Sequence, residues 1–461
     1  MSTQKISIKV YLAILAAGIM SFSGILIETA MNITFPTVMA EFKISTDTVQ
    51  WLTTSYLLVI AIIVPISSFL KKRFSNKYLF ITANLLFVVG TTLAIFSQSF
   101  SLLLIGRVIQ GVGTGISLPL MFNIILEQAP SNKLGAMMGI GSLITAIAPA
   151  LGPTFGGILL TTLGWRYIFI FILPLLLISL ITGLTTISTH HSPEKVEFDV
   201  TSFVLIIFTF FGLIYGISNV SKHGLLSVVV LGSIGIGIVS LLFFISRSLR
   251  IENPLLDLSV FKVPSFSHHA INTFLFLACM LGMSFLIPNY IQIVNQKSAF
   301  VAGLLVLPGA AIGAILSPIA GKVLDRLGSF KPLLFGTVVA LFALIGFSML
   351  GQKLSLIQIV ILFVIYFIGL SFVMGNTMTT GLKDIKKNQV PSGNAIFNTI
   401  QQFAGAVGTS AVSTIVSGVQ GSSTGGQYLH RTALGSQYSF YFLSFMLVVC
   451  LFSLLTLKKE K

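Results

Sequence analysis

Residues 9–35 read KVYLAILAAGIMSFSGILIETAMNITF, and this stretch decides the class of the fold. After Lys9 it contains a single charged side chain, Glu28. A helix needs about 20 predominantly apolar residues to cross the hydrocarbon core of a bilayer. We therefore expect residues 9–35 to form a membrane-spanning helix. No small-residue cleavage site follows the stretch, so we interpret it as a retained first helix rather than a signal peptide.

The composition of the whole chain agrees with this first stretch. Of 461 residues, 55% are hydrophobic and only 8% are charged, whereas soluble domains carry about 25% charged residues. The apolar runs are continuous rather than alternating, which excludes a membrane β-barrel. We expect an all-α membrane protein, located as a multi-pass protein in the cell inner membrane.

The same apolar window can be moved along the rest of the chain. It gives fourteen candidate spans: residues 9–35, 48–70, 78–98, 101–126, 134–160, 166–188, 199–219, 225–246, 266–293, 299–322, 331–350, 355–381, 392–419 and 437–457. The connecting segments are mostly short, so neighbouring helices are expected to be antiparallel.

The basic residues predict the orientation of these spans. The formal net charge is +15, from 27 Lys and Arg against 12 Asp and Glu. With the N-terminus placed in the cytoplasm, most of the basic residues fall in cytoplasmic loops, as the positive-inside rule requires. We therefore predict two cytoplasmic termini and an even number of spans. This bias accounts for the positive charge, so we expect no nucleic-acid binding.

Two similar basic turns suggest an internal duplication. Residues 71–77 read KKRFSNK after the second span, and residues 321–328 read GKVLDRLG after the tenth. We predict an N-terminal six-helix half at 1–190, two inserted membrane helices with linkers at 191–262, and a C-terminal six-helix half at 263–461. Paired halves around a site at the membrane midplane are a transporter architecture.

Two charged residues lie deep inside predicted spans, Glu28 in the first and Arg107 in the fourth. A charge at this depth is costly unless it faces protein or water, so it is a functional hypothesis by default. A carboxylate that lines a cavity can take up a proton on one side of the membrane and release it on the other. We predict that Glu28 and Arg107 couple transport to protons. The alternative is a static pair that holds two helices together.

Candidate substrate-binding residues are polar, aromatic or Met side chains on inward helix faces. Helical spacing places four of them on the faces of Glu28 and Arg107. Adaptable Met and aromatic surfaces suit a polyspecific pocket. The candidates are Ser21, Met31, Asn32, Gln110, Phe276, Met280, Asn289, Tyr290, Asn394, Asn398, Gln401 and Gln402. The alternative for the Met and Phe residues is ordinary packing or contact with lipid.

A further set of residues is predicted to act in gating. Small residues let helices approach closely, and Pro permits a bend. Charged residues at helix ends can anchor or gate a loop; for Glu127 we expect a partner at Lys72 or Arg73. The set comprises Gly152, Pro153, Gly156, Gly157, Lys72, Arg73, Glu127, Asp325 and Arg326.

The remaining residue types suggest no catalysis and no cofactor other than protons as the coupling ion. Cys279 and Cys450 lie in apolar runs, and the six His residues form no set with metal-ligand spacing, so we expect no metal. The run Gly111–Gly115 lies within a span rather than after a strand, so it is not a dinucleotide loop. There is no P-loop Lys, and we predict that the protein is not an enzyme.

Several motifs resemble those of a known family. Residues 105–113, IGRVIQGVG, Gly139 with residues 152–157, GPTFGG, and residues 305–309, LVLPG, are similar to motifs of the fourteen-helix drug/proton antiporters of the major facilitator superfamily. The resemblance runs over nearly the whole chain. It implies that Arg107 takes part in proton coupling and that the glycines of residues 152–157 form the antiporter motif. In residues 26–32, LIETAMN, the acid stands one position later than in that family.

The combined prediction is a proton-coupled multidrug exporter that works by alternating access. We expect a monomer, with small-molecule drugs, protons and membrane lipid as partners. Exchange of one proton favours neutral, zwitterionic or monocationic amphipathic substrates, because export of a dication would move net positive charge against the membrane potential. The alternatives are a dedicated exporter of one physiological metabolite and a membrane sensor or scaffold that transports nothing.

Overall fold

The computed structural model describes residues 7–128, 134–188, 197–251, 254–386 and 389–459. Within these ranges every regular element is a helix, so the all-α prediction is confirmed there. The helices of the N-terminal part are α1 (Ile8–Phe42), α2 (Thr46–Val49), α3 (Trp51–Ile63), η1 (Val64–Ile66), α4 (Ser67–Arg73), α5 (Asn76–Ile95), α6 (Phe100–Gln128), α7 (Leu134–Thr162) and α8 (Arg166–Thr186).

The central and C-terminal parts continue the pattern. The central helices are α9 (Val200–Ser218), α10 (Val220–His223), α11 (Val228–Ser248) and the 3-10 helix η3 (Leu258–Lys262). The C-terminal helices are α12 (Pro264–Ile293), α13 (Ala299–Leu327), α14 (Phe330–Leu350), α15 (Leu356–Lys383), α16 (Val390–Gln420) and α17 (Gly425–Lys459).

Each of the fourteen predicted spans corresponds to helix in the structure. Twelve helical stretches of the described residues are long and apolar enough to cross a membrane. The other two predicted spans are α7, where only Ile147–Thr162 counts as a shorter apolar helix, and α16, whose amide side chains reduce its hydropathy. Fourteen spans therefore stay a prediction.

The second span is interrupted rather than continuous. Pro65 lies in η1, between α3 and α4. Proline has no backbone N–H and cannot complete the helical ladder, so a short 3-10 turn is the expected result. The run of basic residues Lys71–Arg73 then ends α4.

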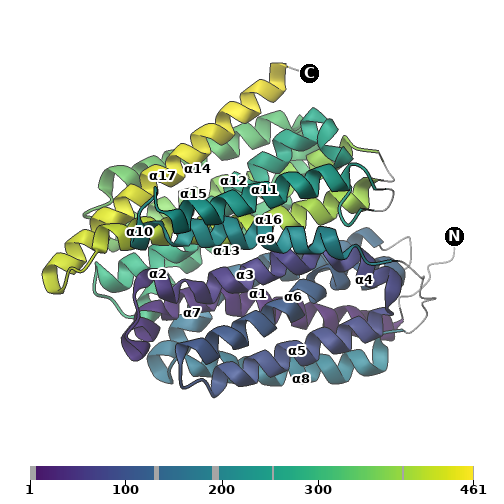
Figure 1. Cartoon of the computed structure of the whole chain (residues 1–461), viewed down its shortest axis with the longest axis horizontal. Helices are drawn as coiled ribbons and strands as arrows, with labels where there is room; N and C mark the ends of the chain where they lie inside the picture. The colour runs from purple at the N-terminus through teal and green to yellow at the C-terminus, as the bar shows by residue number, and fades with distance from the viewer. Residues whose placement is uncertain (1–6, 129–133, 189–196, 252–253, 387–388, 460–461) are drawn as a thin grey trace.

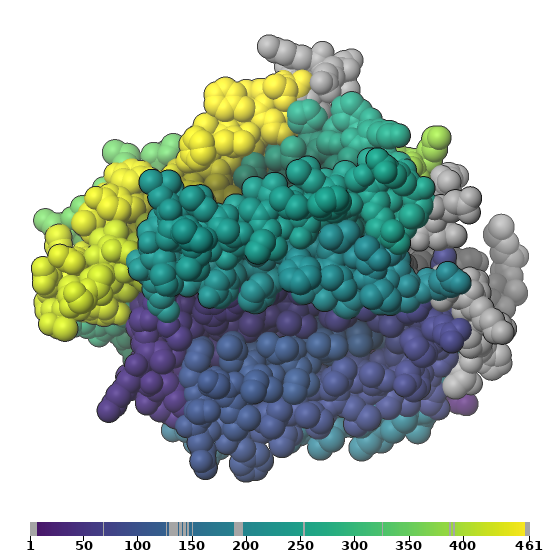
Figure 2. Space-filling model, in the orientation of Figure 1, coloured from purple at the N-terminus to yellow at the C-terminus, as the bar shows by residue number. Residues whose placement is uncertain are grey.

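The helices run side by side and form a bundle with two ends (Figure 1). We call the end where α1 begins and α17 finishes the terminal end, and the opposite end, where α1 finishes at Phe42, the distal end. In Figure 1 the helices of residues 1–188 lie below, α9 and α11 cross the front, and most of the later helices lie above or behind. Figure 2 shows the teal surface of the central helices exposed between these two groups.

The central helices α9 and α11 form a hairpin packed through small residues. A Cβ at Gly212 would lie 2.7 Å from the Ser233 carbonyl oxygen of α11, and one at Gly237 would lie 2.9 Å from Leu213. Such close approach is typical of helix contacts in membranes. At the terminal end, Arg247 donates hydrogen bonds to Asp199 and forms an ion pair with it at 2.9 Å.

The outer faces of many helices are apolar and exposed. Leu242, Phe243, Phe208 and Ile181 are among the large apolar side chains that remain half or more exposed. A soluble monomer rarely exposes so much contiguous apolar surface. This surface is what a helix bundle presents to lipid.

Candidate functional site

Glu28 lies near the middle of the long helix α1 and is buried, with 7% of its surface exposed. No hydrogen bond or ion pair of its carboxylate is found in the part of the chain that the structure describes. Arg107 is near enough to interact with it electrostatically. The two side chains therefore share one buried region without the direct contact that a static pair would make.

Arg107 of α6 is fully buried and held on three sides. Its Nε donates to the Leu52 carbonyl oxygen at 3.1 Å, and its Nη1 donates to Gln110 Oε1 at 2.8 Å. The guanidinium lies over the ring of Tyr56, 4.0 Å from the centroid. Its Nη2 has no hydrogen-bond partner among the described residues. Arg107 is thus a fixed cation whose Nη2 group is still available to donate.

Tyr56 of α3 is a site residue that the sequence analysis missed. Its hydroxyl lies 2.9 Å from the Gly24 carbonyl oxygen and 2.8 Å from Thr114 Oγ1, so it joins α3 to α1 and α6. Gly24 makes this possible, because a Cβ there would lie 2.8 Å from the Thr114 side chain. The signal in the sequence was a tyrosine within an apolar span, because a buried tyrosine hydroxyl usually forms a hydrogen bond.

Two predicted substrate residues form hydrogen bonds between the N-terminal helices. Gln110 donates to Thr91 Oγ1 of α5 at 2.9 Å while accepting from Arg107. Ser21 donates to the Ser117 carbonyl oxygen of α6 at 3.3 Å. Both side chains are fully buried. Their observed contacts connect helices around Glu28 and Arg107.

Asn32 lies one helical turn from Glu28 and reaches the C-terminal group. Its Oδ1 accepts from Thr53 Oγ1 at 2.7 Å, and its Nδ2 donates to Ser284 Oγ of α12 at 3.3 Å. Met31, beside it, is fully buried. Asn32 therefore connects the region around Glu28 to a helix that carries several predicted substrate residues.

The predicted residues of α12 differ in their surroundings. Phe276 is fully buried and Met280 is partly buried. Asn289 donates to the Phe285 carbonyl oxygen of its own helix at 2.7 Å. The Tyr290 hydroxyl accepts from the Leu354 backbone N–H at 3.2 Å, just before α15. Asn289 and Tyr290 thus lie toward the distal end of α12.

Some buried polar groups of the C-terminal helices have no partner. Neither polar atom of the Asn272 amide on α12 is hydrogen-bonded within the described residues, nor is the Tyr366 hydroxyl on α15. Both side chains are fully buried. Buried polar atoms are normally paired, so water or a bound ligand is the expected partner.

The amides of α16 lie toward the terminal end of that helix and are partly buried. Asn398 donates to the Asn394 carbonyl oxygen at 2.9 Å, and Gln401 Nε2 lies 3.8 Å from the sulfur of Met378 on α15. Gln402 is also partly buried. At helical spacing, these four amides share one face of α16.

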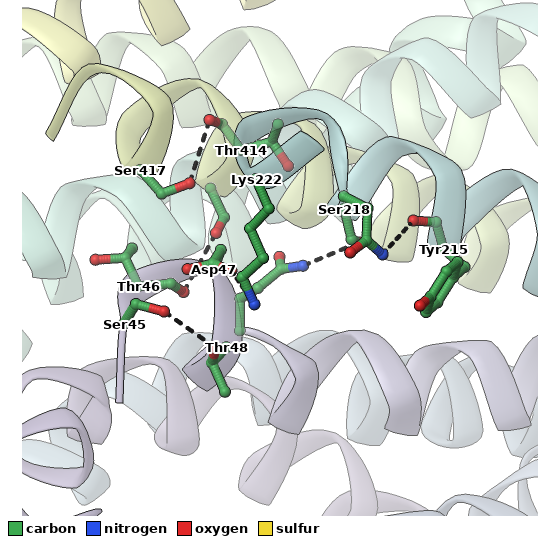
Figure 3. Close-up of polar contacts among 12 residues, drawn as sticks. Ser45, Thr46, Asp47, Thr48, Tyr215, Ser218, Lys222, Thr414 and Ser417 are labelled. Carbon is green, nitrogen blue, oxygen red and sulfur yellow. Dashed lines mark hydrogen bonds and ion pairs between the residues drawn. The ribbon is translucent and has the colours of Figure 1, made fainter. Parts of the chain in front are cut away.

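Polar contacts at the distal end join three groups of helices. Figure 3 shows Lys222 of α10 reaching Asp47 of α2, with an ion-pair distance of 2.8 Å. Thr46 donates to Gln420 of α16 at 2.9 Å, and Gln50 Nε2 lies 3.3 Å from the Ser218 hydroxyl of α9. The sequence analysis named none of these residues, because their pairing requires helices far apart in the chain.

The predicted gating residues of α7 lie against two other helices. Cβ atoms at Gly152 and Gly156 would collide with α1, the second at 2.7 Å from the Ala30 carbonyl oxygen. A Cβ at Gly157 would lie 2.5 Å from the Ala299 carbonyl oxygen of α13. The Pro153 carbonyl oxygen is likewise in the way of any Cβ at Gly303. Side chains larger than hydrogen would separate these helices.

Among the predicted gating charges at the terminal end, Glu127 contacts two other residues. Lys72 or Arg73 was the expected partner of Glu127, and the ion pair that the structure gives joins Glu127 to Lys71 at 3.2 Å; Glu127 also accepts a hydrogen bond from Asn76. Lys72, Arg73 and Arg326 are exposed. The side chain of Asp325 lies outside the described residues. Lys71 and Lys72 point about 100° apart around α4, so which of them reaches Glu127 depends on how that helix is rotated.

The sequence matches a known protein family over most of its length. Residues 17–409 match the family described as Major Facilitator Superfamily. The chain belongs to the Major Facilitator Superfamily. It is 38% identical over 408 residues to lincomycin resistance protein LmrB of Listeria innocua, covering 88% of this chain and 87% of the relative. It is 26% identical over 396 residues to a multidrug resistance protein B homolog of Mycobacterium tuberculosis, covering 84% of this chain and 73% of that one.

Solved structures support the same superfamily fold. A bacterial homolog of the human lysosomal transporter Spinster, in an inward-facing and unoccupied conformation, aligns with a TM-score of 0.72 and 14% identity over 99% of both chains. This major facilitator protein is therefore a multi-pass membrane transporter of the cell membrane and not an enzyme. Its relatives indicate that the substrate is a small molecule.

Proposed function

We propose that this major facilitator protein is a proton-coupled multidrug exporter with Glu28 as the proton-carrying group. The observation that carries the proposal is a buried carboxylate without a direct partner among the described residues, close to an Arg that is held by other groups. The names of the relatives, lincomycin resistance and multidrug resistance, support export of drugs.

The geometry suggests how protonation changes the site. Leu52, Gln110 and Tyr56 hold Arg107 in place whether or not Glu28 is charged. When Glu28 takes up a proton, the buried region changes from an acid–base pair to a lone cation. Because an uncompensated buried charge is costly, the protonated region is stabilised by access to water. Protonation can therefore favour one conformation of α1 over another.

The contacts between helices support alternating access. Thr154 of α7 donates to the Gly303 carbonyl oxygen of α13 at 3.1 Å, and Thr54 of α3 lies 3.1 Å from the Ser410 hydroxyl of α16. These contacts, like the Asp47–Lys222 pair, lie toward the distal end. With both termini in the cytoplasm, this arrangement is a state closed to the outside. Export requires these contacts to separate.

The proton stoichiometry restricts the substrate. If one proton enters for each molecule exported, a neutral or zwitterionic substrate is driven by about 1.4 kcal/mol per pH unit and about 2.3 kcal/mol per 100 mV. A monocation is driven by the pH gradient alone, and a dication is opposed by the membrane potential. The predicted substrates are therefore neutral, zwitterionic or monocationic amphipathic compounds, bound between α1, α12, α15 and α16.

The test is drug-induced proton movement in inside-out vesicles that contain the full chain. Wild type and Glu28→Gln are compared with a panel of drugs that includes lincomycin. Glu197→Gln is the matched control, because Glu197 is an exposed acid outside the helices. We expect wild type and the control to dissipate the pH gradient when drug is added, and Glu28→Gln not to do so.

Other outcomes would contradict parts of the proposal. Drug-dependent proton movement by Glu28→Gln would make Glu28 structural and place the proton carrier elsewhere. Transport of drug by wild type without proton movement would remove the coupling. Strong transport of a dication would contradict the one-proton stoichiometry.

A further inference from the structure

A cavity lies apart from the region of Glu28, between the α9–α11 hairpin and α16. Its volume is about 450 Å³, within the range of about 300–1,000 Å³ that is usual for small-molecule sites. The lining side chains are almost all apolar. They include Phe210 of α9, Phe244 of α11, Leu256, Phe261 of η3, and Ile396 and Ile400 of α16.

Helical spacing separates this cavity from the predicted substrate residues. Ile396, Thr399 and Ile400 line it from one face of α16. At 100° per residue, Asn394 and Asn398 lie on roughly the opposite face. One helix therefore has an amide face toward the bundle and an apolar face toward the hairpin.

Away from Lys262, the walls of the cavity offer no free hydroxyl donor. Its two hydroxyl residues are bonded within their own helices: Thr209 donates to the Leu205 carbonyl oxygen at 2.7 Å, and Thr399 donates to the Ala395 carbonyl oxygen at 2.8 Å. A polar ligand would lose most of its hydrogen bonds to water without replacement. A hydrocarbon chain loses nothing and gains dispersion contacts.

A positive charge lies at the terminal end of the cavity. Lys262, the last residue of η3, is in the lining and is exposed. The acid that faces it, Asp257, accepts from the Ser259 backbone N–H at 2.9 Å and is approached by Gln389 at 3.5 Å. Lys262 forms no direct ion pair with Asp257 or any other acid of the described ranges, so its ammonium can meet an anion.

The α9–α11 hairpin exposes apolar side chains at the surface expected to face lipid. Leu249 and Phe261, both in the lining, are exposed, as are Leu242 and Phe243 on the outer face of α11. The cavity is thus continuous with the surface that faces lipid and closest to the membrane leaflet at the terminal end. We infer that this cavity binds the acyl chain of an anionic phospholipid of that leaflet, with the headgroup at Lys262.

The inference can be tested with the purified full chain in detergent by native mass spectrometry. The probes are phosphatidylglycerol, phosphatidylcholine of the same acyl chains, and a free fatty acid. We expect one phosphatidylglycerol to be retained in preference to the other two. Lys262→Gln should reduce the preference for phosphatidylglycerol over phosphatidylcholine about fivefold, the effect of about one cationic side chain near a lipid surface. Arg250→Gln, an exposed cation outside the lining, should leave the preference unchanged.

A matched pair of variants tests the cavity itself. Leu241→Trp fills it, whereas Leu242→Trp places the same bulk on the lipid-facing side of the same helix. We expect the first to abolish retention of the lipid and the second to preserve it. Equal retention by both variants would overturn the inference, as would equal binding of the fatty acid by wild type.

A measurement on wild type keeps the test valid if Leu241→Trp does not fold. Phosphatidylglycerol with a photoreactive group in its acyl chain is cross-linked to the full chain. Adducts concentrated on residues 241–249 and 396–400 are expected. Adducts spread evenly over the exposed faces of all the helices would contradict a defined site.

Discussion

The polar groups of the N-terminal helices and those of the C-terminal helices are arranged differently. Around Arg107 most of them bond one another, with Arg107 Nη2 left unpartnered among the described residues: Arg107 bonds Gln110, Gln110 bonds Thr91, and Tyr56 bonds Thr114. In the C-terminal helices, Asn272 and Tyr366 are buried without partners in the described residues. The first group holds the Arg107 guanidinium, whereas the second leaves polar atoms that a ligand could bond. Under the proposed function, we expect proton coupling and substrate recognition to be divided between the two groups of helices.

The largest effect is expected from Arg107→Lys. A lysine keeps the charge but cannot reproduce the guanidinium bonds to Leu52 and Gln110. Hydrogen bonds to charged groups contribute about 1.5–3 kcal/mol each, so the free energy of unfolding should fall by about 2–4 kcal/mol. Denaturant unfolding in detergent measures it. Arg326→Lys, at an exposed position, is the control and should change it by less than about 0.5 kcal/mol.

Two tyrosines give the sharpest comparison of the two groups. Tyr56→Phe removes a bonded hydroxyl and should destabilise the protein by about 1 kcal/mol. Tyr366→Phe removes an unpartnered hydroxyl, so stability should stay the same or increase while drug affinity falls. Thermal unfolding and drug binding are measured for both. If Tyr366→Phe destabilises as much as Tyr56→Phe, the proposed division is wrong.

Asn272→Leu sharpens the same comparison from the ligand side. The substitution replaces an unpartnered buried amide with an apolar side chain of similar size, which is often neutral for folding. Loss of a hydrogen bond to a ligand should weaken drug binding by about 1 kcal/mol, or roughly fivefold. Fluorescence titration in detergent measures it. An unchanged drug affinity with wild-type stability would remove Asn272 from the substrate site.

The smallest effect concerns the hairpin between the two groups. Burial alone would raise the pKa of Asp199, but hydrogen bonds from Arg247 and Ser202 outweigh it and hold that pKa below its ordinary value. A lowered pKa in the folded state stabilises the protein above the unfolded pKa of about 3.9, and the contribution is lost as the pH falls below that value. Wild type should therefore melt above Asp199→Asn at neutral pH.

This difference should shrink as the pH is lowered through 4, with Glu197→Gln as a control that behaves like wild type. Melting curves of the three proteins in detergent, taken across that pH range, provide the measurement. A difference between wild type and Asp199→Asn that is independent of pH would exclude the ion pair with Arg247 as its source.

Sequence patterns identified many of the important residues but not their partners. Glu28 and Arg107 were found because a charge within an apolar span is unusual. Tyr56 was missed, because a single tyrosine in a span has no distinguishing pattern until its hydroxyl is seen beside Gly24 and Thr114.

The sequence by itself determined that the chain is a helical membrane protein and which segments form its helices. The physical reason is local: a continuous apolar run can satisfy its backbone in lipid only as a helix, whatever surrounds it. Only the tertiary structure decided that Arg107 bonds Leu52 and Gln110, that Lys222 meets Asp47, and that a cavity separates the hairpin from α16. Such contacts join residues far apart in the chain, and they depend on how whole helices rotate and approach one another.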